Sequence, residues 1–143
     1  MEFRISKIEV AIEQLDWSIR LFLSHKAYIP AITLAGAAEE ILGANLRNID
    51  SEPAFIEVRR ALSDQAGIDL NEAGRDINAP KNWLKHWTNK KDSLEISADI
   101  ESAAIQYIIR AEANLFKFDN SVTNEFPAFW DWLSVYKPEL ISS

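Results

Sequence analysis

The sequence predicts an all-α fold, an antiparallel helical bundle with two long helices and several shorter ones. Apolar residues recur at spacings of three and four over long stretches, as on one face of a helix. No segment alternates with a period of two for long enough to form a strand. Only four glycines and five prolines interrupt the 143 residues, and three of the prolines stand where helices would begin. This length suits one domain, so residues 1–143 are expected to fold as a single unit.

Two long helices frame the expected bundle. The first spans about 4–24, where apolar residues form one continuous stripe: Ile5, Ile8, Ile12, Leu15, Ile19 and Phe22. The second begins at one of several capping residues within 92–97 and runs to about 118, with Tyr107 and Leu115 on its apolar stripe. A helix of roughly 20 residues is about 30 Å long, which sets the length of the bundle.

Shorter helices are expected between and after the long ones. The helix over about 30–47 is rich in alanine and contains Gly36 and Gly43. Each interior glycine costs about 1 kcal/mol relative to alanine, so two of them predict close packing against a neighbour or a ligand. The remaining elements are a helix over 51–63, a turn over 69–76, a helix over 80–87 that begins at Pro80, and an accessory helix within 121–138 that begins at Ser121 or Thr123.

The composition excludes several classes of protein. Apolar residues make up 48% and charged residues 26%, which fits a globular protein. With no cysteine and two histidines, disulfides, thiolate metal sites and a three-histidine zinc site are excluded, and we expect neither a metal nor a cofactor. No apolar run approaches the ~20 residues of a transmembrane helix. Residues 1–12 lack a signal-peptide core, so we expect a cytoplasmic protein that does not enter a membrane.

Charge is distributed unevenly along the chain. The net charge is −7, whereas a protein that binds nucleic acid over its whole surface would be basic. Residues 75–91 nevertheless contain five basic residues and one acidic residue, a local charge of +4. This segment is interpreted either as a solvated, lysine-rich helix end or as an anion site on an otherwise acidic protein.

The most informative stretch of the basic segment is 81–86, Lys-Asn-Trp-Leu-Lys-His. At about 100° per residue, Asn82, Lys85 and His86 fall on one side of a helix. The opposite, anchoring side carries Trp83, Leu84 and Trp87. Histidine can exchange a proton near neutral pH, and neighbouring lysines can hold a phosphate. The alternative interpretation is a surface histidine on an amphipathic helix.

Two charged residues outside this segment could contribute to a site. Glu39 flanks the apolar face of the helix over 30–47. It is interpreted as a partly buried glutamate paired with a lysine or arginine, or as a group that orients His86 or a basic partner. Arg110, on the second long helix, could supply a guanidinium if it faced the same cleft, and a surface salt bridge is the alternative.

These residues also carry a resemblance to HEPN-domain proteins, a family of small helical bundles. In the family's motif an arginine is followed by a polar residue, and a histidine lies five positions after the arginine. Asn82 and His86 match this pattern, whereas Lys81 stands in place of the arginine. The stretches LAGAAEEILG at 34–43 and IRAEANL at 109–115 are similar to helices of bacterial HEPN-like proteins, and the resemblance covers about residues 3–120.

The resemblance implies a bundle that dimerises, so that two copies of the motif meet in one cleft. Active members of the family are metal-independent ribonucleases, often toxins or defence effectors, and other members bind nucleotides or act as non-catalytic partners. In the active members the histidine moves a proton for attack by the ribose 2′-hydroxyl. On this basis the catalytic residues would be Lys81, Asn82 and His86, and the substrate-binding residues would be Lys85, Glu39 and Arg110.

Three functions are compatible with these patterns. We prefer a module that binds RNA, a nucleotide or a protein partner with weak or no catalysis, because a lysine grips phosphate less rigidly than the forked guanidinium of arginine. The alternatives are a metal-independent ribonuclease that uses His86 with Lys81 as its phosphate clamp, and a structural homodimeric scaffold. Trp130 and Trp132 are two residues apart and cannot both face one core, which also favours a homodimer. A protein antitoxin is a further possible partner.

Overall fold

The computed structural model describes residues 1–85 and 94–142, and this part of the chain folds as an all-helical bundle, which confirms the predicted fold class. The elements are α1 (Lys7–His25), α2 (Tyr28–Asn48), α3 (Ala54–Ala66), α4 (Leu70–Lys85), α5 (Ile100–Asp119), α6 (Phe126–Tyr136) and the 3-10 turn η1 (Pro138–Leu140). α1, α2 and α5 contain 19, 21 and 20 residues, so the bundle has one long helix more than expected. Within the described ranges, no helix combines the length and apolar character needed to cross a membrane.

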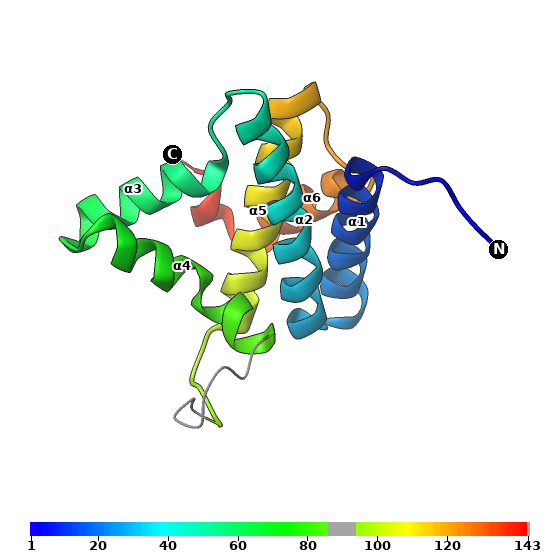
Figure 1. The fold of residues 1–143 in the computed structure, drawn as a ribbon. Coiled ribbons are helices and arrows are strands. Elements are labelled where there is room, and N and C mark those ends of the chain that lie inside the picture. Colours follow the sequence, from blue (N-terminus) through cyan, green and yellow to red (C-terminus); the bar gives the residue numbers. More distant parts are fainter. Residues whose placement is uncertain (86–93, 143) are drawn as a thin grey trace.

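α1 and α2 form an antiparallel pair (Figure 1). A capping box between Ser6 and Glu9 fixes the start of α1. Lys26, which follows α1, has a φ of 51°, and this left-handed conformation reverses the chain before α2 begins. The buried hydroxyl of Ser18 donates a hydrogen bond of 2.7 Å to the carbonyl oxygen of Ala31, which joins the two helices.

α5 packs against α2 and runs in the same direction, unlike the antiparallel pair α1 and α2 (Figure 1). The hydroxyl of Tyr28, at the start of α2, lies 2.9 Å from Glu101 at the start of α5. Further along both helices, Glu39 of α2 pairs with Arg110 of α5. The α3–α4 hairpin, which lies to one side of the three long helices, returns the chain to the starting end and makes this parallel pairing possible.

The hydrophobic core lies between α1, α2, α5 and α6. The ring of Phe22 meets Phe129 and Trp132 of α6 edge-on, at centroid distances of 5.4 Å and 4.9 Å. Trp130, in contrast, is 44% exposed. The prediction that only one of these two tryptophans faces the core is therefore confirmed.

α4 is one helix through Pro80, so the expected turn over 69–76 and new helix at 80 are wrong. Proline removes a backbone donor inside a helix, which normally interrupts its hydrogen bonds. Here the hydroxyl of Tyr107, from α5, is inserted into the adjacent backbone hydrogen bond of α4, the one between Ile77 and Lys81. It donates a hydrogen bond of 2.8 Å to the carbonyl oxygen of Ile77 and accepts one of 3.3 Å from the backbone N–H of Lys81. The inserted hydroxyl links the turns on either side of Pro80, where Figure 1 shows α4 bending.

α5 begins at Ile100, later than the sequence predicted. Its N-cap is Asp99, whose carboxylate accepts the backbone N–H of Ser102 at 3.0 Å. Of the capping residues expected within 92–97, residues 94–97 precede the helix, and 92 and 93 lie outside the described part of the chain.

α6 also begins later than expected, at Phe126 rather than at Ser121 or Thr123. Thr123 is buried, and both its backbone N–H and its hydroxyl donate hydrogen bonds to the carboxylate of Glu112 on α5. Because these groups bind α5, they do not cap a helix, and the chain continues to Phe126 before α6 starts. α6 ends at Tyr136, before Pro138, as expected.

Candidate functional site

Lys81 lies in the last turns of α4 and points toward α2. Its side chain is buried, with 3% of the residue exposed. The aliphatic part passes over Gly36, where a Cβ atom would come within 2.6 Å of the Lys81 Cδ. The Nζ atom lies 2.5 Å from a carboxylate oxygen of Glu40. Lys81 is thus a packed and ion-paired lysine, in contrast to the solvent-exposed side chain expected for a lysine-rich helix end.

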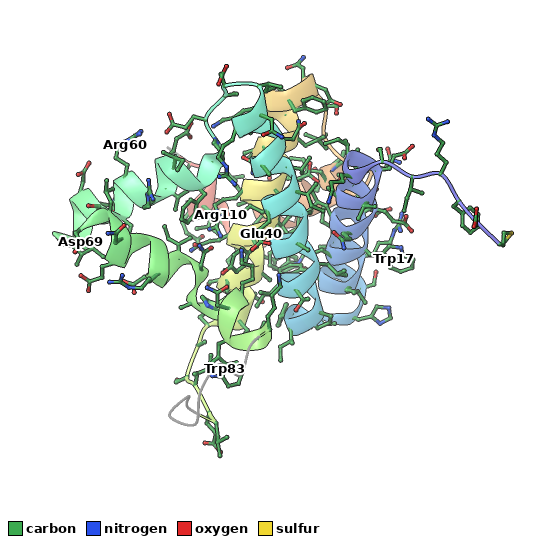
Figure 2. The ribbon with its side chains drawn as sticks, in the orientation of Figure 1. Trp17, Glu40, Arg60, Asp69, Trp83 and Arg110 are labelled. Atoms are coloured by element: carbon green, nitrogen blue, oxygen red, sulfur yellow. The ribbon has the colours of Figure 1, made fainter. Side chains whose placement is uncertain are left out.

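A second ion pair lies one residue earlier on α2. A carboxylate oxygen of Glu39 is 2.6 Å from the Nε of Arg110, and both side chains are 5% exposed. Burial raises the pKa of Glu39, and the Arg110 guanidinium partly opposes this shift. The guanidinium also stacks over the ring of Tyr107, 4.6 Å from its centroid. Figure 2 shows Glu40 and Arg110 near the centre of the molecule, where α2 and α5 meet.

The hydroxyl of Tyr107 connects this ion pair to α4. Burial raises the pKa of Tyr107, so the hydroxyl keeps the proton that it donates to Ile77. Because the same hydroxyl holds the backbone of Lys81, the position of the Lys81 side chain depends on α5 as well as on α4.

Asn114 anchors the other end of the site. Its Oδ1 accepts the backbone N–H of Ala54, the first residue of α3, at 2.8 Å. Its Nδ2 donates to the carbonyl oxygen of Glu39 at 3.4 Å. Asn114 lies four residues after Arg110 and therefore on the same face of α5. Together the two residues fix α2 and α3 against α5.

These groups surround a small polar cleft of about 160 Å³ between α2, α4 and α5. Its polar lining includes Glu39, Glu40, Arg47, Asn78, Lys81 and Asn114. Lys85 stands beside the cleft, with its Nζ 4.0 Å from Glu40. Lys81 and Lys85 therefore both lie close to Glu40, and Arg47 also lines the cleft, while Glu39 is already balanced by Arg110.

The structure brings some of the predicted site residues together and leaves others apart. Lys81, Lys85, Glu39 and Arg110 come together around α2, although Arg110 faces Glu39 and Tyr107 rather than the polar cleft. Asn82 is exposed and does not line the cleft. His86 lies outside the described residues.

Glu39 has the basic partner that its position predicted, and this partner is Arg110. The alternative for Arg110, a surface salt bridge, is wrong because the pair is buried. Of the face expected to anchor this helix, Leu84 packs against the core, whereas Trp83 is 38% exposed and Trp87 lies outside the described residues.

Three residues of the site were not found from the sequence. Glu40 lies on the outer face of α2, with its side chain 56% exposed, and α4 supplies Lys81 as its partner. Tyr107 and Asn114 belong to the apolar stripe of α5 or adjoin it, and their polar atoms join the site through long-range contacts. The sequence offered one indication, which is Asn114 itself. An asparagine on the buried face of a helix requires hydrogen-bond partners for its amide, so it indicates a polar contact with a neighbouring element.

Gly36 gives the first testable prediction. We expect Gly36→Ala to destabilise the fold by about 1–3 kcal/mol, because the new methyl group would overlap the Lys81 side chain, which is held at both ends. Gly43→Ala is the matched control on the same helix, since its Cβ would find its nearest neighbours at 3.6 Å, an ordinary contact. That control should gain up to about 1 kcal/mol from the better helix propensity of alanine. Urea denaturation measures both, and stabilisation by both substitutions would contradict the tight packing of Lys81.

Comparisons with known proteins add no further identification: no family model, curated protein or solved structure matches this chain. The described residues also contain no group of three or more histidine, aspartate or glutamate side chains placed to hold a metal ion. Interpretation of the site therefore depends on its own geometry and charge.

Proposed function

We propose that this chain is an HEPN-like helical module of the cytoplasm that binds RNA or a nucleotide through phosphate at the polar cleft, with weak or no catalysis. The observation that carries this proposal is that two lysines, Lys81 and Lys85, share the single carboxylate of Glu40 at the cleft, which Arg47 also lines. A local positive charge on a chain of net charge −7 favours an anionic ligand at that place.

Weak catalysis follows from the environment of Lys81. A lysine that steadies a transition state has to direct its ammonium group to the charge that develops there. In this chain the ammonium group is held at 2.5 Å by Glu40 and the stem is packed on Gly36. A phosphate can share the ammonium group with Glu40, whereas a close grip on a phosphorane would require the ion pair to open.

Binding can be tested with a fluorescently labelled RNA oligonucleotide and with ATP. We expect Lys85→Ala to weaken binding about tenfold, since a hydrogen bond to a charged group contributes about 1.5–3 kcal/mol. Added salt should weaken the remaining binding. Lys137→Ala is the matched control, because Lys137 is similarly exposed and also pairs with a glutamate, Glu101, but lies outside the cleft. Equal affinity of both variants would contradict the proposed phosphate site.

Catalysis needs a separate experiment, an RNA-cleavage assay in chelator with wild type, Lys81→Arg and His86→Ala. We expect no cleavage by wild type. Cleavage by Lys81→Arg alone would indicate that the fold can support catalysis and that the lysine at position 81 prevents it. Cleavage by wild type that disappears in His86→Ala would instead establish the ribonuclease alternative.

A homodimer and a protein partner are part of the same proposal. The half-exposed Trp17 of α1 supports a contact surface, since exposed tryptophans are frequent at interfaces. Sedimentation velocity over a range of concentrations measures the oligomeric state. A monomer that binds neither RNA nor nucleotide would favour a protein partner, such as an antitoxin, over the phosphate ligand.

A further inference from the structure

A large apolar groove lies on the side of α5 that faces α6, and the polar cleft does not use it. Its volume is about 720 Å³, and its apolar walls include Ile109 and Phe116 of α5 and Phe126 and Trp130 of α6. Small-molecule sites in proteins are usually apolar clefts of about 300–1,000 Å³ with few polar groups, and this groove has that character. Two of its three aromatic side chains, Phe116 and Trp130, are open to solvent.

The polar groups of the groove are acidic. Glu112 belongs to its lining and is 2% exposed, and Asp131 lines the groove from α6. No lysine or arginine of the described residues lines it. The groove is therefore complementary in charge to a cation, and the faces of its aromatic rings also attract positive charge.

Glu112 lacks a counter-ion within the described part of the chain. Both of its carboxylate oxygens accept hydrogen bonds from Thr123, and the negative charge of Asp16 on α1 opposes its ionisation. A buried carboxylate is costly to ionise unless a positive charge accompanies it. Each carboxylate oxygen can accept a second hydrogen bond, so Glu112 could receive an ammonium group without releasing Thr123.

We propose that the groove between α5 and α6 binds a hydrophobic amine, whose apolar body lies against the aromatic walls and whose ammonium group pairs with Glu112. The amine supplies both features that the groove lacks, an apolar cover for Phe116 and Trp130 and a positive charge beside Glu112. This site is separate from the phosphate site, because none of the residues that line the groove lines the polar cleft.

The test compares 4-phenylbutylamine with 4-phenylbutanol and 4-phenylbutyrate, which share the apolar body and differ in charge. Isothermal titration calorimetry at pH 8 should give an affinity at least tenfold higher for the amine than for the alcohol, and the lowest affinity for the acid. Glu112→Gln should remove the advantage of the amine and leave the affinity for the alcohol unchanged. The glutamine amide can preserve both contacts with Thr123, because a threonine hydroxyl can accept as well as donate.

Matched tryptophan variants test the position of the ligand independently of Glu112. Trp130→Ala should weaken the amine and the alcohol alike, whereas Trp17→Ala should change neither, because Trp17 is equally exposed but lies on α1 outside the groove. The proposal is overturned if the amine binds no better than the alcohol, if Glu112→Gln has no effect, or if none of the probes binds. It is also overturned if the protein is a dimer that Trp130→Ala dissociates, since a second copy would then occupy the groove.

Discussion

Arg110→Ala is expected to destabilise the protein by about 3–5 kcal/mol, because it leaves the carboxylate of Glu39 buried without its cation. The two groups are 2.6 Å apart and nearly inaccessible to water, so solvent cannot replace the lost guanidinium. The substitution also removes the stacking of Arg110 on Tyr107, the residue that holds α4 together at Pro80. Denaturation in guanidinium chloride, followed by far-ultraviolet circular dichroism, measures the free energy of unfolding.

Two further variants separate the buried charge from other effects of removing Arg110. Arg60→Ala is the control, since its pair with Glu52 is largely exposed and a surface pair contributes about 0–1 kcal/mol. In Figure 2 Arg60 projects from α3 into solvent, away from the centre of the molecule. The double variant Glu39→Leu with Arg110→Met should recover about half or more of the loss caused by Arg110→Met alone, because it leaves no unpaired charge. A loss below about 1 kcal/mol for Arg110→Ala would show that the pair contributes no more than a surface pair.

The parts of the fold that the sequence predicted are those that depend on local periodicity. The stripe of α1 ends in Phe22, and this ring does reach the centre of the core. The path of α4 was mispredicted because a proline marks a helix start only where the preceding turns do not continue through it. α4 does continue through Pro80, and the hydroxyl of Tyr107, 27 residues further along the chain, bridges Ile77 and Lys81 there; the sequence near Pro80 does not indicate this contact.

The sequence predicted which charged residues belong to the candidate site, but not which of them form ion pairs with one another. The position of Glu39 at the edge of an apolar face indicated a basic partner, but not that this partner would be Arg110 rather than a lysine. A helical wheel describes one helix in isolation, so it directs Glu40 away from the apolar face, to the outer face of α2, and indicates no partner for it. The tertiary structure places α4 over that face and brings Lys81 to Glu40, so the outward-facing carboxylate became part of the cleft.

The two buried glutamates differ in the way their charge is compensated. Glu39 has a guanidinium at hydrogen-bond distance, whereas Glu112 has the backbone N–H and hydroxyl of Thr123. Hydrogen bonds from neutral donors stabilise a carboxylate less than an ion pair does. Burial therefore dominates at Glu112, where it raises the pKa from 4.5 to about 7.

This raised pKa makes the stability of the protein dependent on pH. Below pH 4.5 Glu112 is protonated in both the folded and the unfolded chain, so it makes no pH-dependent contribution to the free energy of unfolding. Between pH 4.5 and about 7 the unfolded chain releases the proton and the folded chain keeps it, so stability falls as pH rises. Each step of one pH within this window lowers the free energy of unfolding by about 1.4 kcal/mol, so Glu112 should remove about 3 kcal/mol of stability across it.

Glu112→Gln should cancel this loss, because glutamine stays neutral at every pH and can keep both contacts with Thr123. The quantity to measure is the difference in unfolding free energy between variant and wild type, by urea denaturation from pH 4 to pH 8. We expect that difference to shift in favour of the variant by about 3 kcal/mol as pH rises, and then to level off above pH 7. Subtracting wild type removes every contribution to the pH dependence that is the same in both proteins. The exposed Glu13 supplies the control, and Glu13→Gln should leave the difference nearly constant. A difference that stays constant for Glu112→Gln as well would mean that Glu112 ionises as readily in the folded chain as in the unfolded one, and that its carboxylate needs no cation from the groove.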